Sequence, residues 1–167
     1  GLYNRRFLNQ FLEREWQSAL RHQHNIAIIM LDIDDFKSYN DTYGHLKGDD
    51  ILIQITKTIK SVIHRPDDML ARYGGEEFVA VLPNSDIDSG VVVAEAMRKA
   101  VEKLNIPHHT SKNEQCVTIS LGVSACIPSP QYSSQLLIKS ADEALYESKH
   151  SGKNSVTEKK IHLDYIS

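Results

Sequence analysis

The sequence predicts an α+β fold in which an antiparallel or mixed sheet is covered by helices. Segments with apolar residues at helical spacing alternate with short β-like runs, in the order helix, strand, helix, hairpin, helix, strand, helix. The chain has 167 residues, 41% of them hydrophobic and 25% charged, which is ordinary for a globular domain. We therefore expect one domain over residues 1–167, without an internal repeat or linker.

The first half of the chain contains two helical stripes around a buried strand. Apolar residues from Phe7 to Leu20 recur at helical spacing and predict a helix over about 2–23, with Trp16 in the core. An apolar run predicts a strand over 25–33, and a second stripe predicts a helix over 49–63. Residues 40–48 are polar with two glycines, so we expect a loop there.

The second half begins with a hairpin signal. Two strand-like runs, 69–73 and 78–82, flank Gly74-Gly75, and a glycine pair between such runs is typical of a tight β-turn. Capping residues at 84–86 predict the start of a helix that ends near Leu104. Residues 117–125 alternate apolar and polar, which predicts a half-buried strand, and a last helix is expected over 133–152.

Charge and hydropathy exclude some classes of protein. The formal net charge of −3 argues against binding to nucleic-acid polymers. The sequence has no apolar run of the roughly 18 residues that span a bilayer and no signal segment at its start, so we expect a cytoplasmic domain without membrane contact.

The cysteines and most histidines are assigned no role. Cys116 and Cys126 fall on one predicted strand about 33 Å apart, so they cannot pair and are expected to be buried free thiols. Four histidines lack the spacing of metal ligands and are expected to be solvated: His22, His24, His108 and His109.

Carboxylates lie where two predicted strands end. The first strand runs into 32–35, which contains three aspartates, and the hairpin turn carries Glu76 and Glu77. Mg²⁺ prefers oxygen ligands and usually binds one or two carboxylates together with substrate phosphates. A single acid at a strand end is usually only solvated, but Asp32 and Glu76 together predict a metal site.

Three lysines accompany these acids in the sequence. Lys37 lies five residues after Asp32, and Lys149 and Lys153 are spaced i, i+4 at the end of the last predicted helix. Surface lysines are usually only solvated charges. Beside a metal they would form an electrostatic clamp for phosphoryl transfer.

Together these segments resemble the GGDEF domain, the catalytic domain of bacterial diguanylate cyclases, over nearly the whole chain. The hairpin at 72–78 is similar to the family signature, with Glu in place of Asp. The other similar segments are 1–6, 32–37 with 40–41, 43–45 with 48–49, 118–124 and 141–154. The resemblance implies a mainly antiparallel five-stranded sheet with flanking helices and ferredoxin-like connections, akin to polymerase palms and nucleotidyl cyclases.

The resemblance also implies roles for the acidic residues. Asp32, the backbone carbonyl of Ile33 and Glu76 would hold two Mg²⁺ ions per active site, with Mn²⁺ as an alternative. One metal would activate the nucleophile and the other would stabilise the leaving pyrophosphate. Glu76 or its neighbour Glu77 would help to deprotonate the ribose 3′-hydroxyl.

By the same resemblance, the lysines and polar residues would bind GTP. Lys37, Lys149 and Lys153 would contact triphosphate oxygens, and Lys37 would neutralise charge in the transition state. Three further residues would line the guanine pocket: Asn40 and Asp49, which would read the guanine edge, and His45.

The implied reaction condenses two GTP into cyclic di-GMP and two pyrophosphates across a homodimer. The chain begins inside the family's opening motif, so we expect a fragment of a longer regulatory protein with an upstream sensor or receiver domain. That longer protein could be membrane-anchored. The residues Arg65, Asp68 and Arg98 would form a product-inhibition site that binds cyclic di-GMP, although a polar turn with a surface ion pair is the alternative.

Other functions remain open at this stage. The domain could be a sensor that binds cyclic di-GMP or GTP without catalysis, or a cyclase with a different nucleotide preference. The intact acids and Lys37 argue against the sensor, and Asp49 argues against adenine. One departure from the family is Lys153, which replaces a more usual arginine and loses bidentate phosphate geometry.

Overall fold

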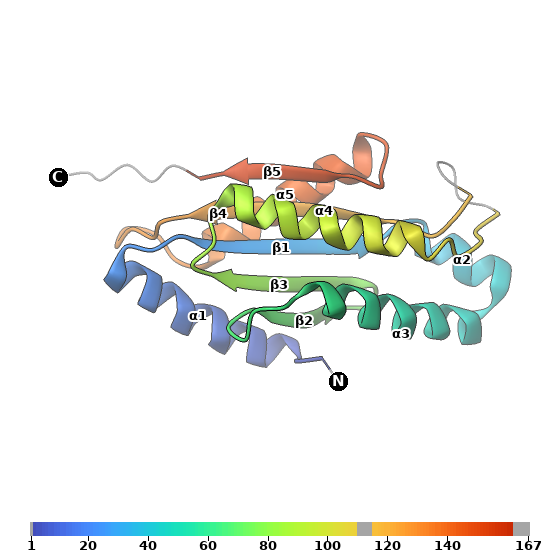
Figure 1. The fold of residues 1–167 in the computed structure, drawn as a ribbon, viewed down its shortest axis with the longest axis horizontal. Coiled ribbons are helices and arrows are strands. Elements are labelled where there is room, and N and C mark those ends of the chain that lie inside the picture. Colours follow the sequence, from blue (N-terminus) through green and yellow to red (C-terminus); the bar gives the residue numbers. More distant parts are fainter. Residues whose placement is uncertain (1, 110–114, 162–167) are drawn as a thin grey trace.

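The computed structural model describes residues 2–109 and 115–161, which form alternating helices and strands (Figure 1). The strands are β1 (Ile26–Ile33), β2 (Met69–Gly74), β3 (Glu77–Pro83), β4 (Ile119–Cys126) and β5 (Val156–Lys160). The helices are α1 (Arg5–His22), α2 (Phe36–Tyr43), α3 (His45–Val62), α4 (Ile87–Lys103) and α5 (Gln135–His150). The α+β fold predicted from the sequence is confirmed.

The five strands form one sheet in the order β2-β3-β1-β4-β5. β1 is central and pairs antiparallel with β3 and β4, and β2 pairs antiparallel with β3. Only the β4–β5 pair is parallel. The expectation of a mainly antiparallel five-stranded sheet is therefore confirmed.

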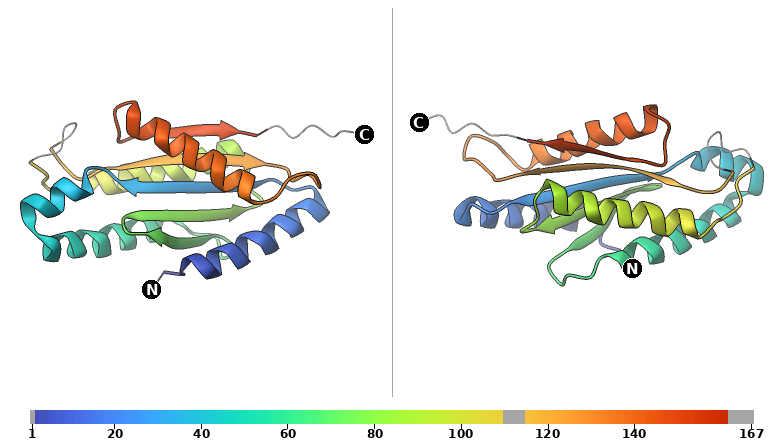
Figure 2. Two further views of the ribbon diagram at one scale, coloured as in Figure 1. Left: turned by 180° about the vertical axis from the view of Figure 1, so that it is seen from behind. Right: turned by 45° about the horizontal axis from the view of Figure 1, so that its top comes forward.

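Helices cover both faces of the sheet. α3 and α4 pack on one face, and α1 and α5 pack on the other, which is in front in the left view of Figure 2. Successive residues of a strand point to opposite faces, so Ile29 and Leu31 join the first core and Ile28 and Met30 join the second. Trp16 is 1% exposed in the second core, as predicted.

The predicted loop over 40–48 is wrong. Residues 36–43 form α2, and α3 begins at His45, four residues before the predicted start at 49. Gly44, with φ of 90°, separates the two helices. Tyr39 is the only fully buried residue of α2, so the apolar periodicity that identifies helices is missing there.

The prediction of a half-buried last strand is also wrong, because β4 is buried on both faces. Ser120 and Ser124, predicted to face solvent, lie under α5, and the Ser124 hydroxyl donates to the carbonyl of Leu137 at 2.7 Å. An ideal Cβ on Gly122 would lie 2.2 Å from the carbonyl oxygen of Ala141. The alternating sequence of β4 therefore separates two buried faces. One carries large apolar residues, and the other carries small residues against which α5 packs closely.

The remaining differences concern the strand ends. β5 is a half-exposed edge strand that the residue pattern did not predict, although the family resemblance implied a fifth strand. Cys116 lies outside β4, where its backbone forms an isolated β-bridge with Pro107. Both Cys116 and Cys126 are buried thiols that form no disulfide, as predicted. His108 is 0% exposed, so its expected solvation is wrong.

The topology gathers polar strand ends at one end of the sheet. β1 ends there, the β2–β3 turn lies beside it, and α2 begins there, all at the right of Figure 1. Over residues 2–109 and 115–161, the helices are all too short or too polar to cross a membrane.

Candidate active site

The carboxylates predicted to share a cation converge at the end of β1. Antiparallel pairing places Asp32 opposite Glu77, and the amide of Ile33 donates to the carbonyl oxygen of Glu76 at 3.4 Å. Asp32, Glu76 and Glu77 are all only partly buried. The sheet register therefore places the C-terminal end of β1 beside the acidic hairpin turn.

Burial and mutual repulsion make this site electrostatically unfavourable for anions. The pKa of Asp32 is raised to about 7, chiefly by desolvation; Lys149 opposes this rise, and the nearby Glu76 and Glu77 add to it. Burial also raises the pKa of Glu77, helped by Asp142 and Glu76. A cation bound here would offset both effects.

The donor set fits Mg²⁺. The Oδ1 atom of Asp32 is buried, has no hydrogen-bond partner among the described residues and forms only a 3.5 Å ion pair with Lys149, so it retains acceptor capacity for a metal. Nowhere in the described chain do three or more His, Cys, Asp or Glu side chains gather to hold a metal. Two carboxylates and the Ile33 carbonyl match the coordination preference of Mg²⁺. This ion binds few protein ligands and completes its coordination shell with water and phosphate oxygens.

Asp34 is a buried hub that sequence reasoning did not select. Its carboxylate is 2% exposed and accepts hydrogen bonds from Thr118 at 2.8 Å, Ser120 at 2.7 Å, the Asn154 amide at 3.0 Å and the Lys149 ammonium at 2.8 Å. These donors come from β4 and the residue before it, from α5, and from the turn before β5. The hub therefore fixes the end of α5 against the end of β1.

Lys149 contacts two of the three predicted metal ligands. Its ammonium donates to the carbonyl of Ile33 at 3.2 Å and lies 3.5 Å from Oδ1 of Asp32. Lys153, expected on the helix, lies beyond the end of α5 in a turn with φ of 61°, and pairs with Asp35 at 2.6 Å. Both ammonium groups therefore reach the site, that of Lys149 from α5 and that of Lys153 from the turn after this helix.

The start of α2 offers unsatisfied backbone donors beside these charges. Asp35 is the N-cap in a left-handed conformation, and no side chain caps the helix. The first N–H groups of a helix, with its dipole, favour an anion such as phosphate. Lys37 is exposed on this first turn, so the turn can bind anionic oxygens through both backbone and side chain.

The predicted base-reading residues lie along α2 and α3. Oδ1 of Asn40 is buried without a hydrogen-bond partner among the described residues, and a Cβ on Gly48 would lie 1.7 Å from it. Asp49, one residue later, lines a hollow of about 440 Å³. His45 is exposed at the start of α3.

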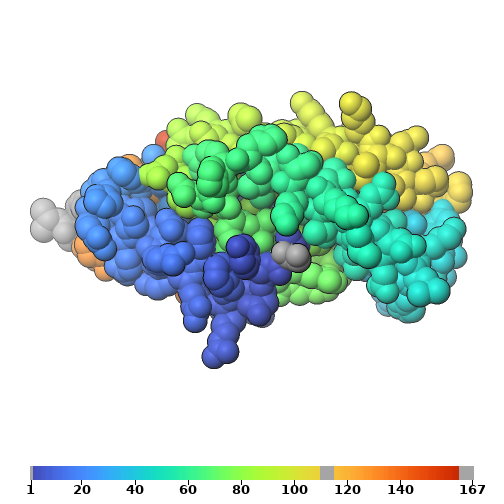
Figure 3. Space-filling view, turned by 60° about the horizontal axis from the view of Figure 1, so that its bottom comes forward, coloured from blue at the N-terminus to red at the C-terminus, as the bar shows by residue number. Residues whose placement is uncertain are grey.

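This hollow has apolar walls that sequence reasoning missed. Leu2, Leu52 and Ile53 line it together with Asp49, and Arg72 lies at its border with a second hollow. Figure 3 shows this side of the molecule, with the N-terminal residues in blue beside α3 in teal. A flat aromatic base can pack between such walls while a carboxylate accepts its N–H groups. The stripe on α3 could have indicated Leu52, but the contribution of Leu2 depends on tertiary contact.

Among the described contacts, none links Arg98 to Arg65 and Asp68, the other predicted inhibitory residues. The guanidinium of Arg65 forms bonds with Asp68 at 2.6 Å, the carbonyl of Pro83 at 2.5 Å and the Ser85 hydroxyl at 2.9 Å. These contacts lie at the far end of β3, roughly 20 Å from the hairpin turn at strand rise. Arg98 instead binds Glu95, Glu102 and Asn154.

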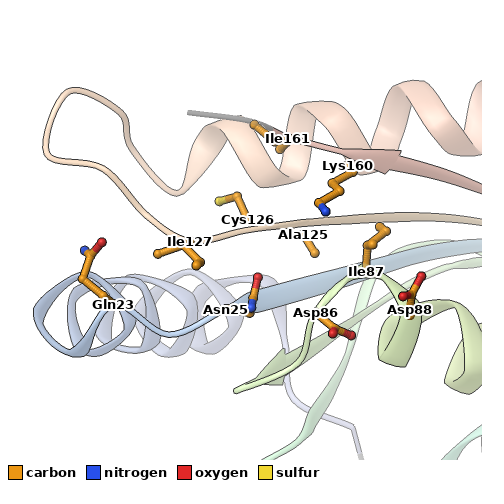
Figure 4. A pocket seen from close by; sticks show the side chains of 10 residues that line it. All are labelled: Gln23, Asn25, Asp86, Ile87, Asp88, Ala125, Cys126, Ile127, Lys160 and Ile161. Carbon is orange, nitrogen blue, oxygen red and sulfur yellow. The ribbon is translucent and has the colours of Figure 1, made fainter. Parts of the chain in front are cut away.

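A separate cavity, also of about 440 Å³, lies at the end of the sheet opposite to the carboxylate site (Figure 4). Asn25 before β1, Asp86 before α4, Cys126 at the end of β4 and Lys160 at the end of β5 line it. It shares no residue with the carboxylate site, and Asp86 already caps α4 by accepting from the Ser89 amide at 2.8 Å.

A palm-like α+β sheet with a carboxylate pair, lysines and a base-sized hollow defines a nucleotidyl-cyclase type of domain. The family described as diguanylate cyclase, GGDEF domain, matches residues 1–155, and the chain belongs to this family.

Relatives and solved structures agree with this membership. Diguanylate cyclase A of Treponema denticola is 45% identical over 146 residues, covering 87% of this chain and 38% of that protein. The coiled coil and GGDEF domain of DgcB from Caulobacter crescentus, in complex with c-di-GMP, has a TM-score of 0.84 at 31% identity over 95% of this chain and 82% of that one.

The active GGEEF domain of a diguanylate cyclase from Vibrio cholerae has a TM-score of 0.82 at 30% identity, covering 97% of this chain and all of that one. The chain spans less than half of the curated relatives that it matches, 38% of the first and 24% of the second.

Proposed function

We propose that this domain condenses two molecules of GTP into cyclic di-GMP and two pyrophosphates. The observation that carries the proposal is the convergence of Asp32, the Ile33 carbonyl and Glu76 with the ammonium of Lys149 at one end of the sheet. Family membership supports the same activity.

The residues of this chain would act by positioning and electrostatics. The guanine packs in the hollow between Leu2 and Leu52, which Asp49 also lines. Asp49 accepts along the guanine edge, and Asn40, which lies against Gly48 one residue before Asp49, contacts the same edge. Asp49 selects guanine over adenine because a carboxylate can accept from the guanine ring N–H and the exocyclic amine together. The specificity for GTP therefore comes from α2 and α3.

The triphosphate would lie between the first turn of α2 and the end of α5. Lys37, Lys149 and Lys153 supply positive charge, and the N–H groups of α2 supply hydrogen bonds. Asp32, the Ile33 carbonyl and Glu76 would hold Mg²⁺, two ions per site, which when bound stabilises negative charge on the reacting oxygens.

The nucleophile is the ribose 3′-hydroxyl of the GTP bound to a second copy of the domain. Its oxygen forms a bond to the α-phosphorus, the bond from that phosphorus to the bridging oxygen breaks, and pyrophosphate leaves. A carboxylate oxygen of Glu77 or Glu76 accepts the hydroxyl proton. The raised pKa of Glu77 suits this role, because a more basic carboxylate accepts a proton more readily.

The test measures product as a function of protein concentration. The domain is incubated with GTP and Mg²⁺, and the nucleotides are resolved by chromatography. Cyclic di-GMP that forms faster than linearly with protein, and is absent with Asp32→Ala and Glu76→Ala, supports a dimeric cyclase. Wild-type rates in these variants contradict the assignment.

The alternative of a non-catalytic sensor has a distinct outcome. Saturable binding of GTP or cyclic di-GMP without product, even after fusion to a forced dimeriser, favours the sensor. The inhibitory site at Arg65 and Asp68, with Arg98 as a partner, and an upstream sensor or receiver domain remain predictions.

A further inference from the structure

His108 is a fully buried histidine that the proposed chemistry has not used. It lies in the connection between α4 and β4, where its amide donates to the carbonyl of Gln115 at 3.0 Å. The rings of Tyr39 and Tyr43 pack edge-on against the His108 ring, with centroid distances of 5.3 Å and 6.3 Å. These aromatic neighbours fix the orientation of the imidazole ring.

One ring nitrogen of His108 contacts the backbone at the start of α2. Its Nε2 lies 3.0 Å from the carbonyl oxygen of Asp35. A carbonyl oxygen can only accept, so we assign the proton to Nε2, which donates it to Asp35; the Ser38 hydroxyl lies 3.4 Å from the same nitrogen. The carbonyl oxygen of Asp35 also accepts from the Tyr39 amide at 3.0 Å and the Ser38 hydroxyl at 3.0 Å.

The backbone conformation of Asp35 connects the carboxylate site at the end of β1 to the expected phosphate donors at the start of α2. Its φ of 54° and ψ of 34° are left-handed, which costs a non-glycine residue roughly 1 kcal/mol. This turn directs the chain from the carbonyl end of β1 into the N-terminus of α2. A strained residue of this kind persists only when surrounding contacts fix it.

Two of the tertiary contacts of Asp35 come from different elements. Lys153 binds its carboxylate at 2.6 Å, and His108 binds its carbonyl. The first contact depends on a lysine that is itself expected to bind phosphate. His108 is fully buried and is not among the expected phosphate ligands, so it can hold the turn whether or not nucleotide is bound.

We propose that His108 is a positioning residue for phosphate binding. Its Nε2–H group holds the carbonyl of Asp35 and so presents the first-turn N–H groups of α2 and Lys37 to the triphosphate. This inference rests on the proposed function, because it assumes that GTP binds at this turn. His108 acts through Asp35 and touches no substrate.

The test compares two substitutions of His108 with one of its exposed neighbour. His108→Phe keeps a ring but removes the donor, His108→Gln keeps an N–H donor at similar reach, and His109→Phe is the matched control. Affinity for Mg²⁺ with a non-hydrolysable GTP analogue is measured by calorimetry. We expect His108→Phe to weaken binding about fivefold to tenfold, the loss of one hydrogen bond, with most of it restored by His108→Gln.

Binding of cyclic di-GMP at its predicted site serves as the second readout, because Arg65 and Asp68 lie at the far end of the sheet. It should be unchanged in all three variants, whereas a general loss of structure lowers it together with GTP binding. Analogue binding by His108→Phe at the wild-type affinity overturns the proposal. Equal losses in His108→Phe and His108→Gln overturn it as well.

Nitrogen NMR of the wild-type domain tests the hydrogen bond itself, even if His108→Phe fails to fold. We expect a protonated Nε2 on His108 that exchanges slowly with water, and an unprotonated Nε2 overturns the proposal. If the wild type binds no GTP analogue, the proposed function fails, and this spectrum still reports separately on the contact with Asp35.

Discussion

Substitution of Gly122 by alanine should separate α5 from the sheet. An ideal Cβ at Gly122 would lie 2.2 Å from the carbonyl oxygen of Ala141, 2.3 Å from the amide nitrogen of Leu145 and 2.9 Å from the carbonyl carbon of Ala144. All three atoms belong to the helix backbone, which cannot rotate away as a side chain can. α5 must therefore retreat by roughly 1 Å to reach ordinary contact distances.

The cost follows from the nature of the clash. Added methyl groups in packed cores cost about 1–3 kcal/mol, and a backbone clash belongs at the upper end. The gain in strand preference from glycine to alanine offsets roughly 0.5–1 kcal/mol. We expect Gly122→Ala to lower the free energy of unfolding by about 2–2.5 kcal/mol, which corresponds to a melting temperature lower by roughly 4–10 °C.

Urea unfolding followed by fluorescence provides the assay. Trp16 is the only tryptophan and is 1% exposed, so its emission reports on the core between α1 and the sheet. Gly74→Ala is the control, since its Cβ would meet nothing within 4 Å. An unchanged midpoint for Gly122→Ala would refute the reasoning. The retreat of α5 should also weaken GTP binding, because this helix carries Lys149 to the site.

Three further predictions concern binding and reactivity. Gly48→Ala should displace the Asn40 side chain, weakening GTP binding about tenfold in calorimetry while the unfolding midpoint stays level or rises through helix propensity; undiminished affinity contradicts the role of Gly48. Arg65→Ala should raise the cyclic di-GMP concentration for half-inhibition at least about tenfold without abolishing synthesis, because it removes the guanidinium from Asp68; unchanged inhibition removes the assignment. Burial raises the pKa of Cys126 to about 12, so its thiolate is scarce at pH 8 and grows about tenfold per pH unit below that pKa. Iodoacetamide followed by peptide mass spectrometry should therefore label it slowly in the folded domain and rapidly in urea, and equal rates contradict its burial.

The sequence alone determined most of the architecture, because strong periodicity survives without tertiary information. The apolar run before Asp32, the glycine pair at 74–75 and the stripes on α1 and α4 predicted their elements to within a few residues. The convergence of Asp32 with Glu76 also followed from the sequence, since strand ends and hairpin turns meet at the edges of a sheet.

Only the tertiary structure decided which polar residues are interior. His108, Ser120 and Ser124 read as solvent-facing because their residue types are usually exposed, yet each lies under another element and bonds to its backbone or to a buried carboxylate. α2 was missed for the converse reason, since it buries little and lacks an apolar stripe. A polar residue carries no local signal of the partner that buries it, so the Asp34 hub and the contact of His108 with Asp35 emerge only when distant segments pack together.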